Sequence, residues 1–376
     1  MKKLTLSALA LAGTLLAGPL LPGSGAWAAG ARWDGADDLA VNPLPCDGGG
    51  GTVAAKPYDG GRATNPPDLA GKPITLIDVP KLIGIGYFNA TSQGMQEAAK
   101  ELGNVHVTTD GPTEAKIDEQ IKFIDNNITR GVNGVLFAAN DPVAIAPVLK
   151  KALSKGIPVV GYDANSTPDA REWFVNQAEF NGIAKAMIDN MAKEIGEDKS
   201  FAIVTSTFTT PNQARWIAEM WAYAQKCHPK MKWLETVEAQ EDNILSFNQA
   251  STLINKYGDQ LAGLFGMTSV ATPASAEAVT RANLCGKVAV VGLATPNAMK
   301  PYVKSDCVKS VVLWNPVNLG YAAVYVMRAV VDGKLAPGAT EVAAGKLGSL
   351  KVVNGSEILL GAPFVFTKQN VNDFNF

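Results

Sequence analysis

Short apolar runs alternate with longer amphipathic stretches from residue 73 onward. The first run, ITLIDVP at 74–80, precedes SQGMQEAAKEL at 92–102, where apolar residues recur at helical spacing until Gly103. VHVTTDG, GVLFAAN and IPVVGYDA are further apolar runs, separated by helical stretches at 114–130 and 143–155. Strands that are apolar throughout and alternate with helices are typical of a parallel sheet covered on both faces.

The same alternation starts again after residues 174–180. The segment EWFVNQ is expected to be extended, and a helical stretch around Met187 follows it. Five more strand candidates come next, namely SFAIVTS, MKWLETVEA, GLFGMT, KVAVVGLA and SVVLWN, with helices between most of them. The apolar helix predicted at 318–333 should be buried inside one lobe. The pattern therefore predicts an α/β protein with two similar lobes.

The N-terminus has the features of a secretory signal peptide over residues 1–28. Two lysines precede the apolar run LTLSALALAGTLLAGPLL, and Ala-Trp-Ala at 26–28 supplies small residues for cleavage. A membrane anchor is the alternative, but Pro19 and Pro22 interrupt the apolar run before it reaches the ~20 residues that a span needs. No cysteine follows the cleavage position, which argues against a lipid anchor. We therefore expect an exported, periplasmic protein.

Residues 29–72 differ from the rest of the chain. They are rich in Gly, Pro and Asp and have no periodicity, so they are not expected to fold alone. We interpret them as an extended N-terminal arm, attached through Cys46. The disulfide candidates are Cys46, Cys227, Cys285 and Cys307, an even number that an oxidising compartment permits to pair. Cys285 and Cys307 each precede an apolar strand and would pair if those strands are neighbours.

Charge and length narrow the classes of partner. The formal net charge is −2, and removal of Lys2 and Lys3 with the signal peptide would make it more negative. Without basic runs, such a chain is a poor nucleic-acid binder. Neither CxxC nor Cys/His spacing is present, and His106 and His228 are isolated, so we expect no metal and no cofactor. The length agrees with two domains.

Polar and aromatic side chains gather where the predicted strands end. Parallel sheets bind ligands at the carboxyl ends of their strands. Hydroxyls, amides and aromatics dominate there, and this mixture suits a neutral, polyhydroxylated ligand. These residues are Lys81, Tyr87, Phe88, Asn89, Asn140, Asp141, Tyr162, Asp163, Asn165, Thr207, Thr209, Asn212, Gln213, Thr268, Ser269, Thr295, Asn297, Trp314 and Asn315.

Several of these positions also have a structural interpretation. Asp141 stands before Pro142 and is most simply a helix cap. Asp163 has no helix directly after it, so capping explains it less well. Lys81 could be a solvated loop residue, and Phe88 could belong to the core. Asn212 and Gln213 could cap a helix, and Trp216, Trp221 and Tyr223 have the helical spacing of core residues.

Catalytic motifs are missing from the sequence. Gly84-Ile85-Gly86 opens like a dinucleotide fingerprint, but Asn89 stands where the third glycine is required. We find no G-x-S-x-G, no phosphate loop and no Ser-His-Asp or Cys-His set. Binding without chemistry is the prediction, and a secreted enzyme is the less favoured alternative.

Four segments resemble the periplasmic sugar-binding proteins of ABC importers. They are PKLIGIGYFNATSQGMQEAAKELG, DGPTEAKIDEQIKFIDNNITRGVNGVLFAANDP, GLATPNAMKPYV and LWNPVNLGYAAVYV. The resemblance is strongest to the branch with the autoinducer-2-binding and rhamnose-binding proteins, and it covers about residues 74–375. It implies a type I periplasmic binding fold, in which two Rossmann-like lobes are hinged by three crossovers. By analogy, the first lobe takes 73–177 and 316–340, and the second takes 178–315 and 341–376.

The resemblance also implies binding residues. Lys81 and Asp163 match a lysine and an aspartate that contact ligand in the autoinducer-2 binders, and Phe88 would line the same wall. Their Asp-Gln pair falls on Asn212-Gln213, and a proline and an alanine fall on Met267 and Ser269. These three departures favour a different pentose, deoxyhexose or polyol over autoinducer-2. Asn315 lies where related proteins often place a hinge-side amide.

The implied function is capture of a small sugar-like ligand for an ABC transporter permease, by a monomer. A sensor that presents its closed form to a chemoreceptor or sensor kinase is the alternative, since the same cleft serves both. Cytoplasmic sugar-responsive repressors share the fold, but the signal peptide and the lack of DNA-binding helices exclude that class.

Overall fold

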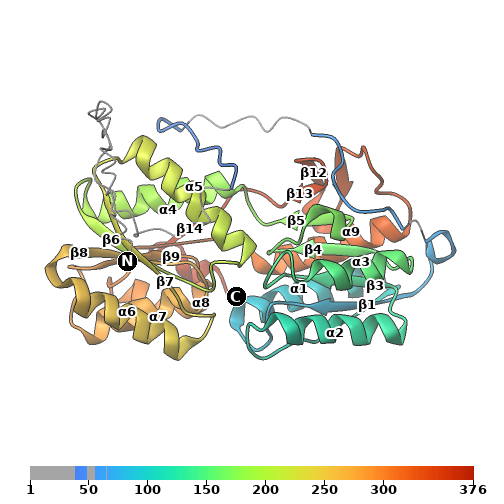
Figure 1. Ribbon diagram of the computed structural model, residues 1–376, viewed down its shortest axis with the longest axis horizontal. Coiled ribbons are helices and arrows are strands. Elements are labelled where there is room, and N and C mark those ends of the chain that lie inside the picture. The colour runs from blue at the N-terminus through green and yellow to red at the C-terminus, as the bar shows by residue number, and fades with distance from the viewer. Residues whose placement is uncertain (1–38, 49–55, 65) are drawn as a thin grey trace, which may run out of the picture.

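Two β-sheets, each with its own helices, build two lobes that lie side by side (Figure 1). The computed structural model describes residues 39–48, 56–64 and 66–376. The predicted signal peptide and the rest of the arm lie outside these residues. Within the described part of the chain, no helix has both the length and the apolar character that crossing a membrane requires.

The first lobe contains an eight-stranded sheet in the order β11-β12-β13-β5-β4-β3-β1-β2. Its central strands are apolar throughout because helices cover both faces: Leu136 and Val160 pack on the side of α1 and α9, and Val135 and Val159 on the side of α2 and α3. Its parallel core and helices are β1 (Ile74–Val79), β2 (Val105–Thr109), β3 (Gly134–Phe137), β4 (Val159–Tyr162), β5 (Trp173–Asn176), α1 (Gly86–Leu102), α2 (Ile117–Arg130), α3 (Ala146–Ser154) and α9 (Pro316–Val331).

The second lobe contains a four-stranded parallel sheet in the order β7-β6-β8-β9. A single bridge, Leu293 to Val312, joins it to β10, which pairs with the antiparallel β14. The elements are α4 (Phe180–Ile195), β6 (Ser200–Thr205), α5 (Pro211–Cys227), β7 (Lys232–Glu238), α6 (Asn243–Tyr257), β8 (Leu261–Gly266), α7 (Ala271–Arg281), β9 (Ala289–Gly292), α8 (Pro296–Lys304), β10 (Ser310–Leu313) and β14 (Phe364–Thr367).

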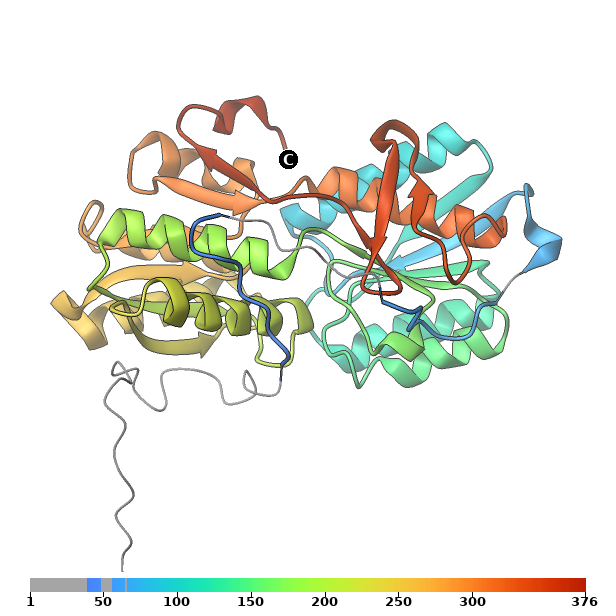
Figure 2. The ribbon, with the colours of Figure 1, turned by 90° about the horizontal axis from the view of Figure 1, so that it is seen from above.

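Residues 341–359 belong to the first sheet, which corrects the assignment of 341–376 to the second lobe. They form β11 (Glu341–Ala343), β12 (Ser349–Val353) and β13 (Glu357–Leu359). Without β13, the buried strand β5 would be an exposed edge of the first sheet. β13 pairs in parallel with β5 and covers that edge. Figure 2 shows these strands on one lobe and the C-terminal segment on the other.

The chain crosses between the lobes three times within residues 66–376. The crossings follow β5, β10 and β13, each time between an element of one sheet and an element of the other lobe. All three carry the chain past the same central region (Figure 2). Such short connections between two rigid units are where a hinge motion concentrates.

Several helices begin at other residues than the sequence predicts, and α1 differs most. α1 begins at Gly86 rather than Ser92, so Tyr87 and Phe88 lie in its first turn instead of a loop. Gly84 has φ 90°, which only glycine adopts readily, and it turns the chain from β1 into the helix. α3 begins at Ala146 rather than Val143, because a separate turn precedes it.

The described parts of the arm dock on different lobes. Residues 39–48 lie on the second lobe, where Cys46 is bonded to Cys227 with a Cα–Cα distance of 5.5 Å. Residues 56–64 lie on the first lobe, where the Gly61 amide donates to the Arg171 carbonyl at 2.8 Å. Cys285 and Cys307 form the second disulfide, so all four candidate cysteines are paired.

The helices α1 and α9 approach each other closely enough for backbone contact. A Cβ atom added at Gly94 would lie 1.8 Å from the Val317 carbonyl oxygen, and one at Gly320 would lie 1.9 Å from that of Thr91. Any side chain larger than hydrogen at either position would push the helices apart. Because α1 begins at the cleft and α9 follows a crossover, this contact fixes the cleft-facing end of the first lobe.

Replacement of Gly94 by alanine should lower the free energy of unfolding by about 1–3 kcal/mol, because the overpacking exceeds alanine's gain in helix propensity. Urea denaturation of the full chain measures this. Gly361→Ala is the control, since no heavy atom lies within 4 Å of its added Cβ. Equal stability of the two variants would contradict the close helix contact.

Candidate functional site

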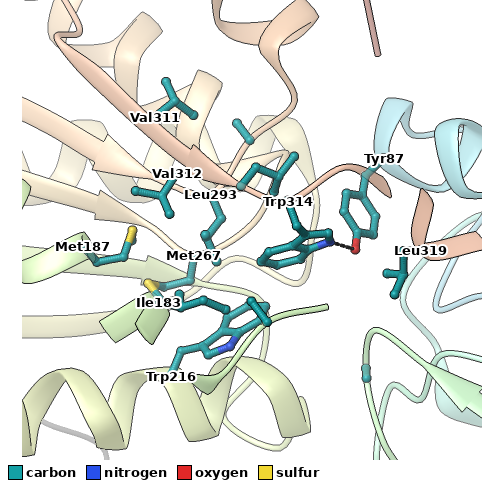
Figure 3. Close-up of a cluster of buried hydrophobic side chains, with 14 of the residues drawn as sticks. Tyr87, Ile183, Met187, Trp216, Met267, Leu293, Val311, Val312, Trp314 and Leu319 are labelled. Atoms are coloured by element: carbon teal, nitrogen blue, oxygen red, sulfur yellow. Dashed lines mark hydrogen bonds between the residues drawn. The ribbon is translucent and has the colours of Figure 1, made fainter. Parts of the chain in front are cut away.

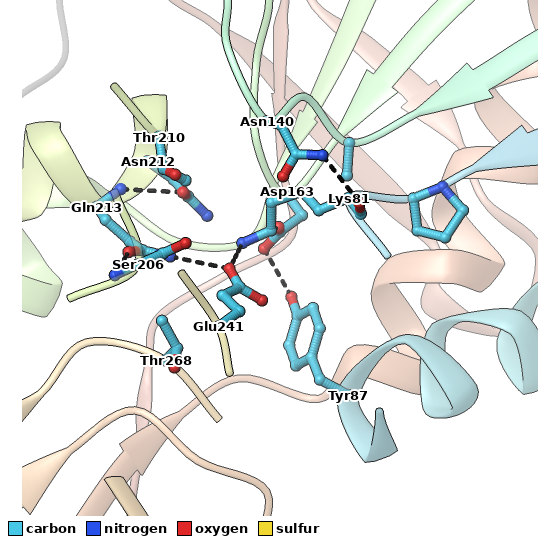
Figure 4. Close-up of polar contacts among 12 residues, drawn as sticks. Lys81, Tyr87, Asn140, Asp163, Ser206, Thr210, Asn212, Gln213, Glu241 and Thr268 are labelled. Carbon is cyan, nitrogen blue, oxygen red and sulfur yellow. Dashed lines mark hydrogen bonds and ion pairs between the residues drawn. The ribbon is translucent and has the colours of Figure 1, made fainter. Parts of the chain in front are cut away.

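A small cavity lies between the lobes, at the carboxyl ends of both sheets. The first lobe contributes a lysine, a carboxylate and aromatics, and the second contributes amides, hydroxyls, a carboxylate and apolar side chains. Figure 4 shows the polar groups of both lobes. The lining residues are Lys81, Ile85, Tyr87, Phe88, Asp163, Asn212, Gln213, Trp216, Glu241, Met267, Thr268, Ser269, Leu293, Leu313 and Trp314.

The structure brings most of the predicted binding residues together in this cavity. Lys81, Phe88, Asp163, Asn212, Gln213, Met267 and Ser269 all line it. Asn315 is not among the lining residues. It is the N-cap of α9, where its side-chain oxygen accepts a hydrogen bond from the Asn318 amide at 3.1 Å. Local capping of the helix after β10 therefore accounts for Asn315.

Asp141, the other ambiguous position, also has a capping role. Its carboxylate accepts hydrogen bonds from the amides of Val143 at 2.9 Å and Ala144 at 2.8 Å. These bonds close the turn that precedes α3. Asp141 does not line the cavity.

Asp163 lies just after the end of β4, and only one of its two carboxylate oxygens accepts a hydrogen bond. Its φ is 59°, a left-handed conformation that Asp and Asn tolerate better than most residues. The Tyr87 hydroxyl donates to Oδ1 at 2.9 Å, and the Trp314 indole donates to that hydroxyl at 2.8 Å. Oδ2 is buried without a hydrogen-bond partner. Burial raises the pKa of Asp163 to about 6, although Lys81 and Tyr87 act against it.

Lys81 reaches across the cleft and forms an ion pair with Glu241 of the second lobe (Figure 4). Its Nζ is also 4.0 Å from Asp163 Oδ2. Burial lowers the pKa of the amine, but the charges of Glu241 and Asp163 outweigh burial and raise the pKa above its ordinary value. Lys81 is therefore a buried cation between two carboxylates.

The loop that carries Lys81 is braced from behind by two amide side chains. Asn140 donates to the Lys81 carbonyl at 2.8 Å. Gln120 of α2 donates to the carbonyls of Pro80 at 3.0 Å and Ala138 at 2.7 Å, and accepts from the Asn140 amide at 3.1 Å. Asn140 thus supports the cleft without lining it.

Gln213 orients Glu241 from the second lobe. Its side-chain oxygen accepts from the Thr205 hydroxyl and the Ser206 amide, both at 2.8 Å, which leaves the amide nitrogen facing the cleft. That nitrogen donates to Glu241 at 3.2 Å. Because both partners of its oxygen lie at the end of β6, the sheet itself sets the position of this amide.

Glu241 is the cleft residue that sequence reasoning missed. It lies three residues after the end of β7, in a left-handed conformation with φ 54°. The rule used for the other strands, that polar residues after the carboxyl end of a parallel strand face the ligand, applies to it as well. The signal that identifies it is its place just after the predicted strand MKWLETVEA.

Aromatic and aliphatic side chains form the apolar part of the cavity lining. Trp216 and Trp314 have ring centroids 5.6 Å apart, and Trp314 packs edge-on to Tyr87 at 6.1 Å (Figure 3). Met267 and Leu293 lie beside the indoles (Figure 3). Trp216 was predicted to be a core residue, and it is both buried and part of this lining. Its indole nitrogen is buried without a hydrogen-bond partner.

The site has the chemistry of a binding pocket. No histidine or cysteine lines the cavity. Across residues 39–48, 56–64 and 66–376 there is no group of three or more His, Cys, Asp or Glu side chains that could hold a metal ion. What the lining offers is one unpaired acceptor, polar donors and a broad aromatic face.

Comparison with known proteins relates this architecture to solute receptors. Residues 79–335 match the periplasmic binding protein domain family. Over 224 residues the chain is 28% identical to the D-ribose/D-allose-binding protein of Pseudomonas aeruginosa, covering 56% of this chain and 68% of that protein.

Two solved structures match most of the chain. An ABC transporter solute binding protein from Clostridium phytofermentas with bound L-rhamnose has a TM-score of 0.77 and 28% identity, covering 80% of this chain and 98% of that one. LsrB from Clostridium saccharobutylicum in complex with AI-2 has a TM-score of 0.76 and 21% identity, covering 81% and 100%. At that identity, the second match shows the fold alone.

Replacement of Asp163 by asparagine should raise the free energy of unfolding of the ligand-free protein at about pH 8, by on the order of 1–3 kcal/mol, and change it little near pH 4. The folded pKa of about 6 exceeds the ordinary 3.8. The cost of burying the charge is therefore fully present above about pH 6 and disappears as pH falls to about 4. Asparagine cannot ionise and keeps the left-handed backbone.

Urea denaturation at both pH values measures this difference. Asp141→Asn is the matched control, because it makes the same change after the neighbouring strand and outside the cavity. An effect of Asp163→Asn that is equal at both pH values would show that its carboxylate is not strained by burial.

Proposed function

The chain belongs to the periplasmic binding protein family, and from this membership we propose that it is a receptor that captures one small sugar or sugar-like molecule for an ABC importer. Two parallel-sheet lobes joined by three crossovers agree with the type I periplasmic binding fold that the sequence resemblance predicted. Proteins of this family bind substrates rather than transform them, which agrees with the lack of catalytic motifs.

The observation that carries the proposal is the composition of the closed cavity. Lys81, Asp163 and Gln213 offer charged and amide groups to the cavity, and Trp216 and Trp314 offer indole rings. A sugar matches both kinds of group, because its hydroxyls donate and accept hydrogen bonds while the C–H face of its ring packs on an aromatic surface. The unpaired Asp163 Oδ2 needs a donor, which a sugar hydroxyl supplies.

The ligand we propose is a pentose, a deoxyhexose or a polyol. The space between the lobes is small, which fits a monosaccharide better than an oligosaccharide. The apolar wall of Met267, Leu293 and Leu313 would leave ring hydroxyls without partners, so it favours a ligand with a methyl or methylene group there. Relatives that are named for D-ribose or contain L-rhamnose support this range.

Closure of the two lobes is the mechanism we infer. Lys81 and Asp163 come from the first lobe, and Gln213 and Glu241 come from the second, so a ligand touches both sets only when the lobes are shut. Ligand binding therefore shifts the protein toward its closed form. The closed form is what a permease would recognise.

We also propose a cellular location and a partner for this receptor. Export through the predicted signal peptide at 1–28 would place the receptor in the periplasm, where the Cys46–Cys227 and Cys285–Cys307 disulfides are stable. We propose a monomeric receptor that delivers its ligand to an ABC transporter permease.

A thermal-shift screen against pentoses, deoxyhexoses, polyols and autoinducer-2 tests this function. A ligand present at 100 times its dissociation constant should add about 2.7 kcal/mol to the stability of the folded state. We expect one neutral monosaccharide or polyol to raise the melting temperature well beyond the others. Failure of every member of the panel to stabilise the protein would refute sugar binding.

Calorimetry with the best ligand then tests the site. Asp163→Asn should weaken binding by about 1.5–3 kcal/mol, or roughly 10- to 150-fold, because it removes a charged acceptor. Asp141→Asn should leave the affinity unchanged, since Asp141 closes a turn outside the cavity. Equal affinities of the two variants would place the ligand elsewhere.

A further inference from the structure

The cleft contains more negative than positive charge. Lys81, Asp163 and Glu241 are 5%, 2% and 6% exposed, so all three are buried. Among the residues that line the cavity, Lys81 is the only cation, and no arginine or histidine accompanies it. Two carboxylates therefore face one amine in a space closed off from water.

The single cation is already paired with a group of the protein. Lys81 forms its ion pair with Glu241, a residue from the opposite lobe. Gln213 holds Glu241 in that position with a hydrogen bond of 3.2 Å, and Gln213 is itself fixed by Thr205 and Ser206. Glu241 therefore cannot turn away from Lys81 without losing the Gln213 hydrogen bond as well.

We propose that Glu241 selects the charge of the ligand: by pairing with Lys81, it restricts the cleft to uncharged polyhydroxylated molecules and excludes their carboxylate and phosphate derivatives. This inference rests on the proposed function, and it adds a specificity-determining residue and a ligand charge to it.

The exclusion follows from the cost of leaving a buried charge without a partner. An anionic ligand would lie against Asp163 Oδ2, which is buried, accepts no hydrogen bond and lies 4.0 Å from the Lys81 amine, which already pairs with Glu241. Lys81 could turn to the anion only by leaving Glu241, and Glu241 would then be the buried, unpaired charge. Either arrangement weakens binding of the anion relative to the neutral molecule.

A neutral hydroxyl avoids both costs. Asp163 Oδ2 and Lys81 Nζ are 4.0 Å apart. Because a hydroxyl both donates and accepts, a single ligand hydroxyl between them can donate to Asp163 Oδ2 and accept from the Lys81 amine. The Lys81–Glu241 pair stays intact in that complex. The cleft thus favours a hydroxyl group, because a hydroxyl has no charge and can both donate and accept a hydrogen bond.

Glu241 could instead serve only to hold the closed lobes together. A purely structural role would change the affinities for neutral and anionic ligands by the same factor, whereas charge selection changes their ratio. The ratio of the two affinities is therefore the quantity to measure.

Calorimetry with the neutral sugar that gives the largest thermal shift, and with the same sugar oxidised to a carboxylate at its terminal carbon, measures that ratio. The unmodified protein should prefer the neutral form by on the order of 100-fold. Glu241→Gln should reduce this preference at least about tenfold, because it frees Lys81 to pair with the ligand carboxylate while keeping the shape of the side chain.

Glu235→Gln is the matched control. Glu235 lies on β7, the strand that precedes Glu241, and pairs with a lysine, Lys256, at 2.6 Å, but it does not line the cavity. This variant should keep the preference of the unmodified protein.

Each other outcome contradicts a defined part of the account. Tight binding of both the sugar and its acid by the unmodified protein would overturn charge selection while leaving sugar binding in place. An unchanged preference in Glu241→Gln would overturn the role of Glu241. Stabilisation by the acids alone would overturn both the inference and the proposed neutral ligand.

Discussion

The site depends on a buried lysine between two carboxylates that come from opposite lobes. Charges removed from water are tolerated only when they are paired, and Lys81 meets Glu241 only if the lobes are closed. The ion pair thus couples the chemistry of the pocket to the conformation of the whole molecule. Asp163 keeps one oxygen without a hydrogen bond. A ligand that donates a hydrogen bond to this oxygen therefore stabilises the closed cleft.

The fold supplies the rigidity that such a cluster needs. Gln120 and Asn140 brace the loop of Lys81 from behind, and the end of β6 fixes Gln213. The close contact of Gly94 and Gly320 with the facing backbone holds α1, and with it Tyr87, against α9. Motion is left to the three crossovers, so each lobe carries its half of the site as a unit.

Much of this could be predicted from the sequence because strand–helix alternation is a local signal. The carboxyl ends of the apolar runs predicted Lys81, Asp163 and Gln213, which the structure brings into one cavity. The lobe to which residues 341–359 belong could not be predicted. These short strands pair with the free edge of β5, and such long-range pairing leaves no local pattern in the sequence. The N-cap position of α1 is Ile85, whose side chain cannot cap a helix, so the sequence carries no signal for the start of α1 at Gly86. Glu241 was within reach of the same rule and was overlooked.

A crystal structure of the protein grown with its best-binding neutral sugar would show directly whether this cleft is the binding site. We expect the sugar between the lobes, with one hydroxyl donating to Asp163 Oδ2, Lys81 still paired with Glu241, and the ring against Trp216 or Trp314. A sugar bound outside this cavity, or Lys81, Asp163 and Gln213 pointing away from it, would rule out this cleft as the binding site.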